Sequence, residues 1–343
     1  MHPFELQLTN AWTPSRWRGL SLAIAVSGGA DSIALLRGMA RLRASDTRLI
    51  VLHFHHYLRG TESDEDARFV RNLAEVLQCE FRCNWDLKTP TQPFSNSSDE
   101  SSLRTARYHF LEQQALALGA RYLVTAHTLE DQAETALFQL LRGSGSGLAG
   151  IRPFRASYQT PDLVIARPLL QTRRDTVIDY LKHLQQPFRV DSSNANLSYS
   201  RNWIRNDLFP RIEERIPEFK AALARSMQVQ QEWMDWIEEQ FPSIESQAML
   251  QRDTSGFTVN RLALQSYPWL IVHAFLRSCW LNQNWPLGSM SFDHWKVIRE
   301  AVFSDRSESF HHVFPGQVRM KREQDAVSFS KTIDEKPTKG ESA

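Results

Sequence analysis

The chain has 343 residues, of which 42% are hydrophobic and 23% are charged, so it is long enough for two domains with packed cores. The formal net charge of +1 excludes a globally basic nucleic-acid-binding protein, although a local positive groove stays compatible with it. No apolar run approaches the ~20 residues that span a bilayer, the first residues do not form a secretory signal, and the cysteines are too few for a disulfide framework. We therefore expect a cytoplasmic protein without a membrane segment.

The first part of the chain alternates between strand patterns and helix patterns. Strands are expected at residues 22–26, 49–54, near Phe81 and at 121–127, and helices at 31–44, 64–78, 103–118 and 129–142. Polar loops are expected at 89–102 and 143–150. This alternation predicts an α/β fold with a doubly wound parallel sheet, in which ligands bind beyond the carboxyl ends of the strands.

Long helical patterns rich in Trp, Gln and Glu begin after residue 215. We expect a first domain over residues 1–215, a second, smaller, mostly helical domain over 216–330, and a disordered tail over 331–343. The tryptophans of the second domain have helical spacing, which favours a place in its core over stacking on nucleic-acid bases.

A glycine pair separates the first strand from the helix that follows it, in the segment Ser27-Gly28-Gly29-Ala30-Asp31-Ser32. Such glycines let backbone N–H groups approach an anion, and the helix N-terminus adds partial positive charge. Asp31 would repel a bare phosphate, so it indicates either a metal-bridged phosphate or a role in shaping the loop. The loop lacks the GK[ST] pattern of a Walker A motif, and a plain strand–helix turn is the alternative interpretation.

Two carboxylates, Asp131 and Glu134, stand at i and i+3 of the expected helix 129–142 and therefore share one of its faces. Together they could hold an ammonium group and accept its proton, or they could belong to a solvated acidic face. Arginines are frequent in residues 152–174 and 201–225. They could form a local positive groove, or they could belong to ordinary solvated faces.

The glycine segment resembles the pyrophosphate-binding loop of the PP-loop ATPases, which split ATP between its α and β phosphates. Further segments resemble one branch, the tRNA(Ile)-lysidine synthetase family: HFHHYLR (53–59), ARYHFL (106–111), TAHTLEDQAET (125–135), RGSG (142–145), RPLL (167–170), DSSN (191–194) and RNWIR (201–205). They cover about residues 22–210. In this chain His55 replaces the family's usual Asn, Thr128 its His and Glu130 its Asp. The segment 312–322 (HVFPGQVRMKR) is similar to a hairpin late in the family's second domain.

The resemblance implies an ATP-dependent ligase that joins free L-lysine to C2 of cytidine 34 in the CAU anticodon of isoleucine tRNA. The reaction would pass through an adenylated cytidine and release AMP and pyrophosphate. The resemblance implies ATP and Mg²⁺ as cofactors, and isoleucine tRNA and lysine as partners. It also implies that the first domain is a PP-loop domain and that the second domain binds tRNA. The resemblance does not decide the oligomeric state, and a homodimer is one of the alternatives.

The resemblance also implies the site residues. Catalytic roles would belong to Asp31, Asp131, Glu134, Arg107 and Arg205. ATP would contact Ser27, Gly28, Gly29, Ala30, Asp31, Ser32, His53 and His55, with Asp31 reaching Mg²⁺ through the phosphates. The other substrates would contact His127, Asp131, Glu134, Arg201, Asn202 and Arg205. Arg107 and Arg205 suit a lysine carboxylate, a phosphate or RNA equally, and His127 is either a ligand contact or a satisfied histidine.

Three other functions share parts of this pattern. A PP-loop tRNA thiolase would need a reactive cysteine, but Cys79 and Cys83 are spaced C-x-x-x-C, away from the expected strand ends. A small-molecule amide ligase would need neither the arginine-rich segments nor the second domain. A catalytically inactive nucleotide-binding module would not need Asp31, Asp131 and Glu134.

Overall fold

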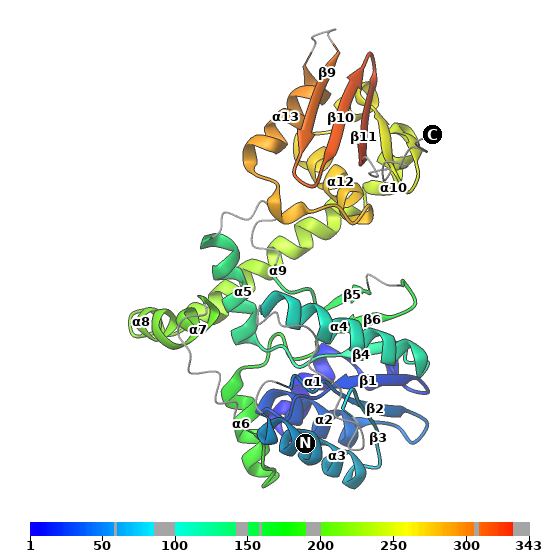
Figure 1. Cartoon of the computed structure of the whole chain (residues 1–343). Helices are drawn as coiled ribbons and strands as arrows, with labels where there is room; N and C mark the ends of the chain where they lie inside the picture. The colour runs from blue at the N-terminus through cyan, green and yellow to red at the C-terminus, as the bar shows by residue number, and fades with distance from the viewer. Residues whose placement is uncertain are drawn as a thin grey trace, which may run out of the picture. The chain divides into compact units, whose positions relative to one another are not determined.

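The computed structural model describes residues 1–57, 60–85, 100–141, 150–157, 160–189, 200–304 and 309–331. The chain divides into two compact units, Met1–Val229 and Gln230–Ala343 (Figure 1). The division falls within helix α9 (Phe219–Glu238), whereas the sequence pattern places it between residues 215 and 216. The role of each unit as a functional domain stays a prediction.

The first unit is built on a six-stranded sheet with the order β3-β2-β1-β4-β6-β5, which Figure 1 shows side by side. Its strands are β1 (Ser21–Ala25), β2 (Arg48–His53), β3 (Glu80–Cys83), β4 (Tyr122–Val124), β5 (Phe154–Ala156) and β6 (Val164–Ala166). Neighbouring strands are parallel except for β5, which is antiparallel to β6. This topology confirms the predicted doubly wound α/β fold, and it leaves a switch point between β1 and β4, from which the strand order runs in opposite directions.

Eight α-helices accompany this sheet in the described part of the unit before α9. They are α1 (Pro3–Ala11), α2 (Ala30–Leu42), α3 (Thr61–Val76), α4 (Glu100–Ala117), α5 (Leu129–Leu141), α6 (Arg174–His183), α7 (Ser200–Trp203) and α8 (Phe209–Glu213), with a 3₁₀ turn η1 (Pro14–Arg16) and a π-helical turn η3 (Ile204–Leu208). The expected strands, and the expected helices that correspond to α2, α3, α4 and α5, are confirmed within a few residues. The sequence pattern did not indicate α1, α6, or the short strands β5 and β6.

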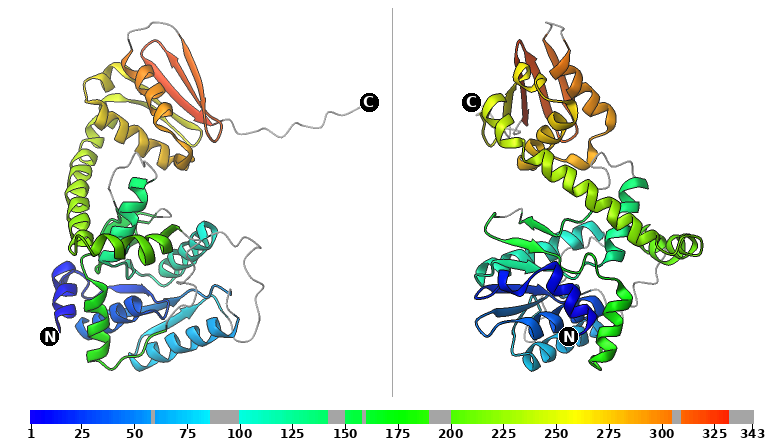
Figure 2. Two further views of the ribbon diagram at one scale, coloured as in Figure 1. Left: turned by 90° about the vertical axis from the view of Figure 1, so that its left-hand side faces the viewer. Right: turned by 180° about the vertical axis from the view of Figure 1, so that it is seen from behind.

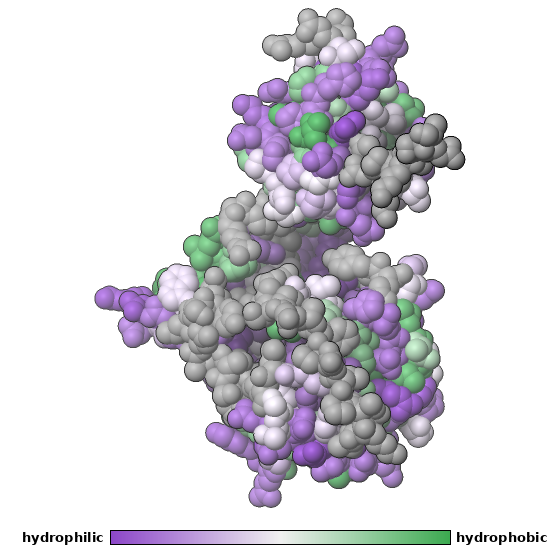
Figure 3. Space-filling model, viewed as in Figure 1, coloured by the Kyte–Doolittle hydropathy of each residue, from purple (hydrophilic) through white to green (hydrophobic). Residues whose placement is uncertain are grey.

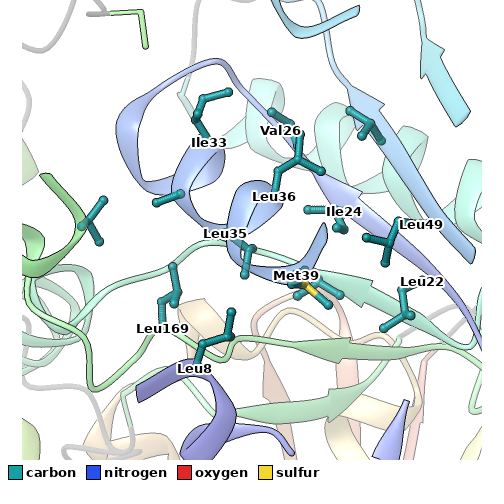
Figure 4. Packing of buried hydrophobic residues seen from close by; sticks show 14 of the residues in the cluster. Leu8, Leu22, Ile24, Val26, Ile33, Leu35, Leu36, Met39, Leu49 and Leu169 are labelled. Carbon is teal, nitrogen blue, oxygen red and sulfur yellow. The ribbon is translucent and has the colours of Figure 1, made fainter. Parts of the chain in front are cut away.

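The strands of this unit alternate between two hydrophobic cores. Leu22 and Ile24 of β1 pack with α1, α2 and α6 on one face, and Ala23 packs with α4 on the other. Figure 4 shows the first of these cores between the sheet and α2, and Figure 2 shows helices on both sides of the sheet. Because both faces are covered, the central strands read as continuous apolar runs rather than as alternating patterns.

The second unit contains a five-stranded antiparallel sheet with the order β7-β8-β11-β10-β9. Its elements are α10 (Phe241–Ala248), β7 (Met249–Arg252), β8 (Gly256–Asn260), α11 (Arg261–Gln265), α12 (Trp269–Asn282), the 3₁₀ turn η4 (Leu287–Ser289), α13 (Phe292–Phe303), β9 (Phe310–Phe314), β10 (Val318–Glu323) and β11 (Ala326–Lys331). Helices account for more of the described residues of this unit than strands do, as expected, but the sequence pattern did not indicate a sheet of five strands. The strands are short, and one face of β10 is exposed, so their apolar signal is weak beside that of the helices.

The hairpin of β9 and β10 confirms the expectation for residues 312–322. The two strands pair antiparallel, with Phe314 opposite Val318. Gly316 and Gln317 adopt φ angles of 79° and 60°, which close the turn between them. Trp280 and Trp285 lie in the core of this unit, as the helical spacing favoured, while Trp233 and Trp236 of α9 are exposed.

The described residues in Figure 3 form a mainly hydrophilic surface with small separate apolar areas. Among the described residues, none of the helices combines the length and apolarity needed to cross a membrane. Most of the expected loops 89–102 and 143–150, and the tail after Lys331, lie outside the described residues. The segments 142–145 and 191–194 lie outside them as well.

The packing of α1 gives a stability prediction. Phe4 is fully buried, stacks on Tyr180 of α6 at a centroid distance of 4.5 Å, and reaches α2 at Gly38, where an added Cβ would lie only 2.9 Å from its ring. We expect Phe4→Ala to lower the free energy of unfolding by about 3–5 kcal/mol, because it leaves a cavity among three helices. Leu6→Ala on the exposed face of α1 should cost less than about 0.5 kcal/mol. Urea denaturation of the full chain checks this, and equal losses for the two variants would contradict the packing.

Candidate functional site

The candidate residues converge at the carboxyl edge of the parallel strands, beside the switch point. Ser27 follows β1 and His127 follows β4, and these two strands are paired from Leu22–Tyr122 to Ile24–Val124. The loop after β1 leads into α2, and the loop after β4 leads into α5. Both loops therefore open onto one crevice, which is the usual ligand position in such sheets.

The glycine loop holds its shape through its own side chains. The Ser27 N–H donates to the Ser32 hydroxyl at 3.2 Å, and that hydroxyl donates to the Gly29 carbonyl at 2.9 Å. Gly28 adopts φ 99°, a conformation that favours glycine, and Gly29 is the N-cap of α2 without a side-chain cap. The N–H groups of the first turn are thus left for an anion.

Asp31 stands in the first turn of α2 with an unusual environment for a carboxylate. Its Oδ1 is buried and has no hydrogen-bond partner in the described part of the chain. Burial raises the pKa of Asp31 to about 6; Arg174 opposes the shift and Asp131 adds to it. An ionised, unpartnered carboxylate oxygen beside an anion loop is suited to a cation.

Asp131 is held in place by the start of its own helix. Its Oδ2 accepts the Thr128 N–H at 2.8 Å and the Thr128 hydroxyl at 3.2 Å. Thr128 is the residue before α5, so this is one half of a capping box with the carboxylate at the third helical position. The threonine that replaces the family's histidine therefore positions Asp131.

Arg205 joins the two carboxylates of α5. Its Nε lies 2.5 Å from Oε1 of Glu134, and its Nη2 lies 3.2 Å from Oδ1 of Asp131 and 3.1 Å from Oε2 of Glu134. Glu134 is only 4% exposed, so its charge requires such a partner. Burial works to lower the pKa of Arg205, but Glu134 and Asp131 raise it overall, which keeps the guanidinium charged. Arg205 lies on the π-helical turn η3, a distortion that is frequent at functional sites.

A cavity of about 350 Å³ lies beside this cluster. Both acidic and basic residues line it: Glu130, Glu134, Arg173, Arg174, Asp175, Arg205, Glu213 and Lys220. Glu130 also accepts the N–H of Arg174, the first residue of α6, at 3.1 Å. Such a lining suits a small zwitterion that carries both signs of charge.

His127 follows β4, and charged side chains of both signs affect its protonation. Its Nδ1 is 2.9 Å from the Thr125 hydroxyl. Burial lowers the pKa of His127, Asp131 opposes this shift, and Arg167, Arg104 and Arg107 add to it. The imidazole is therefore neutral, and it can accept or donate a hydrogen bond without carrying charge.

The remaining predicted site residues lie on β2, the loop after it, α4 and α7. His53 is buried with Nδ1 2.8 Å from the Val26 carbonyl, and Nε2 of His55 is 3.0 Å from Asp64, so both rings have structural partners. Their predicted contact with ATP stays a prediction. Arg107 lies on α4, with its guanidinium 5.6 Å from the Tyr108 ring centroid. Asn202 and Arg201 belong to α7, and the side chain of Arg201 lies outside the described part.

Sequence reasoning missed several residues that the fold brings to this edge. Arg174 and Glu130 link α6 to α5, and Arg167 follows β6 two strands from the glycine loop. Arg167 stands in the RPLL segment and in the arginine-rich stretch 152–174, and these two signals could have singled it out.

The chain is similar to known proteins over most of its length. A family profile described as a PP-loop domain matches residues 2–212. The tRNA(Ile)-lysidine synthase of Rhodopirellula baltica is 34% identical, with 89% of this chain and 85% of that protein covered. That of Geobacter sulfurreducens is 30% identical, with 93% and 67% covered. Among solved structures, the U34-tRNA thiolase NcsA from Methanococcus maripaludis, with its [4Fe-4S] cluster, gives a TM-score of 0.56 at 15% identity over 67% of this chain and 78% of that chain, a likeness of fold alone.

Asp31 gives a pH-dependent stability prediction. The pKa of Asp31 rises from 3.8 to about 6 on folding. Its contribution to the free energy of unfolding is therefore fully present below pH 3.8 and is lost as the pH rises through about 6. We therefore expect Asp31→Asn to stabilise the ligand-free chain by about 1–2 kcal/mol at about pH 8, and to have little effect below about pH 4.

Asp293→Asn is the matched control, since Asp293 occupies the same first-turn position in α13 but is exposed. It should slightly destabilise the chain at about pH 8, because a first-turn carboxylate stabilises a helix N-terminus. Thermal unfolding across this pH range checks both variants. A destabilising Asp31→Asn at high pH would show that the carboxylate has a favourable partner.

Proposed function

We infer the function from one premise: the chain belongs to the tRNA(Ile)-lysidine synthase family of PP-loop proteins. We propose that it ligates free L-lysine to C2 of cytidine 34 in the CAU anticodon of isoleucine tRNA, with ATP as the activating substrate. The observation that carries this proposal is the pairing of Asp131 and Glu134 beside the glycine loop, because these carboxylates would hold an ammonium group next to the phosphates of ATP.

The glycine loop supports the use of ATP. The N–H groups at the start of α2 and the Ser27 hydroxyl would bind phosphate oxygens, and the φ of Gly28 lets the chain turn there. In the first step, O2 of cytidine 34 would attack the α-phosphorus of ATP, and the bond to pyrophosphate would break. This step converts an unreactive urea-like carbonyl into a centre with AMP as its leaving group.

The residues present also fit Mg²⁺. The buried, unpartnered Oδ1 of Asp31 is the kind of hard oxygen ligand that this ion takes. In the described part of the chain, no group of three or more His, Cys, Asp or Glu residues forms a metal cage. Mg²⁺ usually combines one or two carboxylates with substrate phosphates and water, so a single carboxylate is compatible with it. When bound, the ion would offset the negative charge of the phosphates.

The acidic pair would handle the second substrate. In the second step the ε-amine of lysine would attack C2, the bond from C2 to the adenylated oxygen would break, and AMP would leave. The amine must lose a proton to do so, and Asp131 or Glu134 would accept it. His127, which is neutral, would orient a substrate group by hydrogen bonding.

Arg205 occupies the oxygens that a lysine ammonium would need. Lysine binding would therefore displace the guanidinium or share the carboxylates with it. We propose that Arg205 then turns toward the lysine carboxylate or a phosphate, for which its planar fork is suited. In the absence of substrate it keeps the buried charge of Glu134 neutralised.

The thiols give no support to the thiolase alternative. Burial raises the pKa of Cys83 to about 11 and that of Cys279 to about 11, and burial also raises the pKa of Cys79. A persulfide-carrying or sulfur-transferring cysteine needs the opposite shift. An RNA-binding role of the second unit and a homodimeric state stay predictions.

Glu134→Gln tests the lysine site. It removes the charge but keeps the shape, so we expect the KM for lysine to rise at least about tenfold while the KM for ATP stays within about twofold. Glu213→Gln is the control, since Glu213 lines the same cavity but is paired with Lys220 at 3.0 Å. Steady-state kinetics at varied lysine and ATP check this. If both KM values rise alike in Glu134→Gln, the assignment of the pair to lysine is wrong.

Mass spectrometry of the tRNA tests the reaction itself. After incubation with ATP, Mg²⁺ and lysine, cytidine 34 of isoleucine tRNA should gain the mass of one lysine less one water. The gain should be absent without lysine, and Asp31→Ala should abolish both it and tRNA-dependent ATP–pyrophosphate exchange. An unmodified cytidine 34 with active wild-type exchange would favour a different acceptor.

A further inference from the structure

Arg167 is buried without the partners that a buried guanidinium needs. It is 5% exposed and follows β6 directly. Its Nη1 donates to the Arg152 carbonyl at 2.8 Å, but its Nε is buried without a hydrogen-bond partner in the described part of the chain. Burial lowers the pKa of Arg167, as expected for a charge without adequate compensation. An orphaned buried donor on a charged group is costly, so a partner from outside the chain would stabilise it.

Tyr108 and Arg104 of α4 face the same place. The Tyr108 hydroxyl is also buried, and it donates to no acceptor among the described residues, because the neighbour of its oxygen is the Arg167 guanidinium, which can only donate. The Arg104 guanidinium carbon lies 5.1 Å from the Tyr108 ring centroid. Burial raises the pKa of Tyr108, but the positive charges of Arg104, Arg167 and Arg107 lower it by more. Positive charge therefore surrounds the phenol from several directions.

Glu112, a buried carboxylate of the same helix α4, is already in use. Glu112 accepts the Ser157 hydroxyl and lies 3.9 Å from Arg155, which is the neighbour that adds positive charge around Arg167. Among the described ion pairs, none joins Arg104 or Arg167 to a carboxylate. Donors thus outnumber acceptors at this place, which is typical of an anion site before its anion binds.

This cluster is separate from the glycine loop. In the sheet order β1-β4-β6, Arg167 follows β6 and Ser27 follows β1. Two strand spacings separate them, about 10 Å. His127 follows the intervening strand β4, and its pKa is raised by the charge of Asp131 and lowered by the charges of Arg167 and Arg104. The arginine cluster therefore flanks the crevice on the side of β6.

We propose that Arg104, Tyr108 and Arg167 form a second phosphate site, which binds a backbone phosphodiester of the RNA substrate while the glycine loop binds ATP. This inference rests on the proposed function. A phosphodiester offers the negative charge and the acceptor oxygens that the orphaned Nε and hydroxyl lack, and guanidinium forks match its geometry. Its position across β4 from the glycine loop is where an acceptor nucleotide must lie to meet activated phosphate at the switch point.

Arg104→Ala and Tyr108→Phe test the site, since Arg104 is exposed and its removal spares the core. Arg121→Ala is the matched control: it removes an exposed arginine that precedes β4, at the opposite edge of the same sheet. Binding of isoleucine tRNA is measured by fluorescence anisotropy over a series of salt concentrations, and the KM for ATP is measured by pyrophosphate exchange.

We expect Arg104→Ala to weaken tRNA binding about tenfold and to reduce the slope of log K against log salt by about 1, because one phosphate contact is lost. Tyr108→Phe should weaken binding about threefold without changing the slope, because it removes a neutral donor. Arg121→Ala should stay within about twofold of the wild type. The KM for ATP should be unchanged in all three variants.

Two results would overturn the inference. A raised KM for ATP in Arg104→Ala and Tyr108→Phe, with unchanged tRNA binding, would assign the site to a phosphate of ATP instead of RNA. Identical behaviour of Arg104→Ala and Arg121→Ala in both assays would remove the phosphate site altogether. If the wild type forms lysidine normally, either result contradicts only the second phosphate site and leaves the proposed function in place. A wild-type chain that modifies no tRNA would instead contradict the proposed function.

Discussion

The parallel pairing of β1 with β4 is the constraint on which the candidate site depends. These strands are separated by about a hundred residues of chain, yet Ile24 lies opposite Val124. The pairing brings the loop before α2 next to the loop before α5, and thus the proposed phosphate-binding turn next to a pair of carboxylates. The two cores, one on each face of the sheet, keep that register, since a slip by one residue would exchange the faces of every apolar side chain in these strands.

Two charged groups at this edge lack a full set of partners in the described part of the chain, and a third depends on a single arginine. Asp31 lacks a partner for Oδ1, the acidic pair relies on Arg205, and Arg167 has an orphaned donor. Buried charges of this kind cost stability in the free protein. Binding of a cation, an ammonium group and phosphates would compensate all of them together, so the electrostatic imbalance itself describes the expected set of substrates.

The departures from the family pattern have local explanations. Thr128 donates to Asp131 from the start of α5, Glu130 uses its longer side chain to reach the first N–H of α6, and His55 bonds to Asp64. In each case the replacement makes a contact that fixes the backbone or orients a neighbour. The acidic pair of α5 is therefore positioned although the residues around it differ from the family's usual ones.

The amino-acid sequence by itself determined the βαβ alternation, the glycine loop, the spacing of Asp131 and Glu134 on one helix face, and, through the motif resemblance, the family. These are local properties, set by apolar periodicity, by backbone freedom at glycine and by residue order. It did not determine that Arg205 closes the acidic pair or that Arg104 and Arg167 meet around Tyr108. Those contacts join elements far apart in the chain, and only the strand order and the packing of helices on the sheet bring them together.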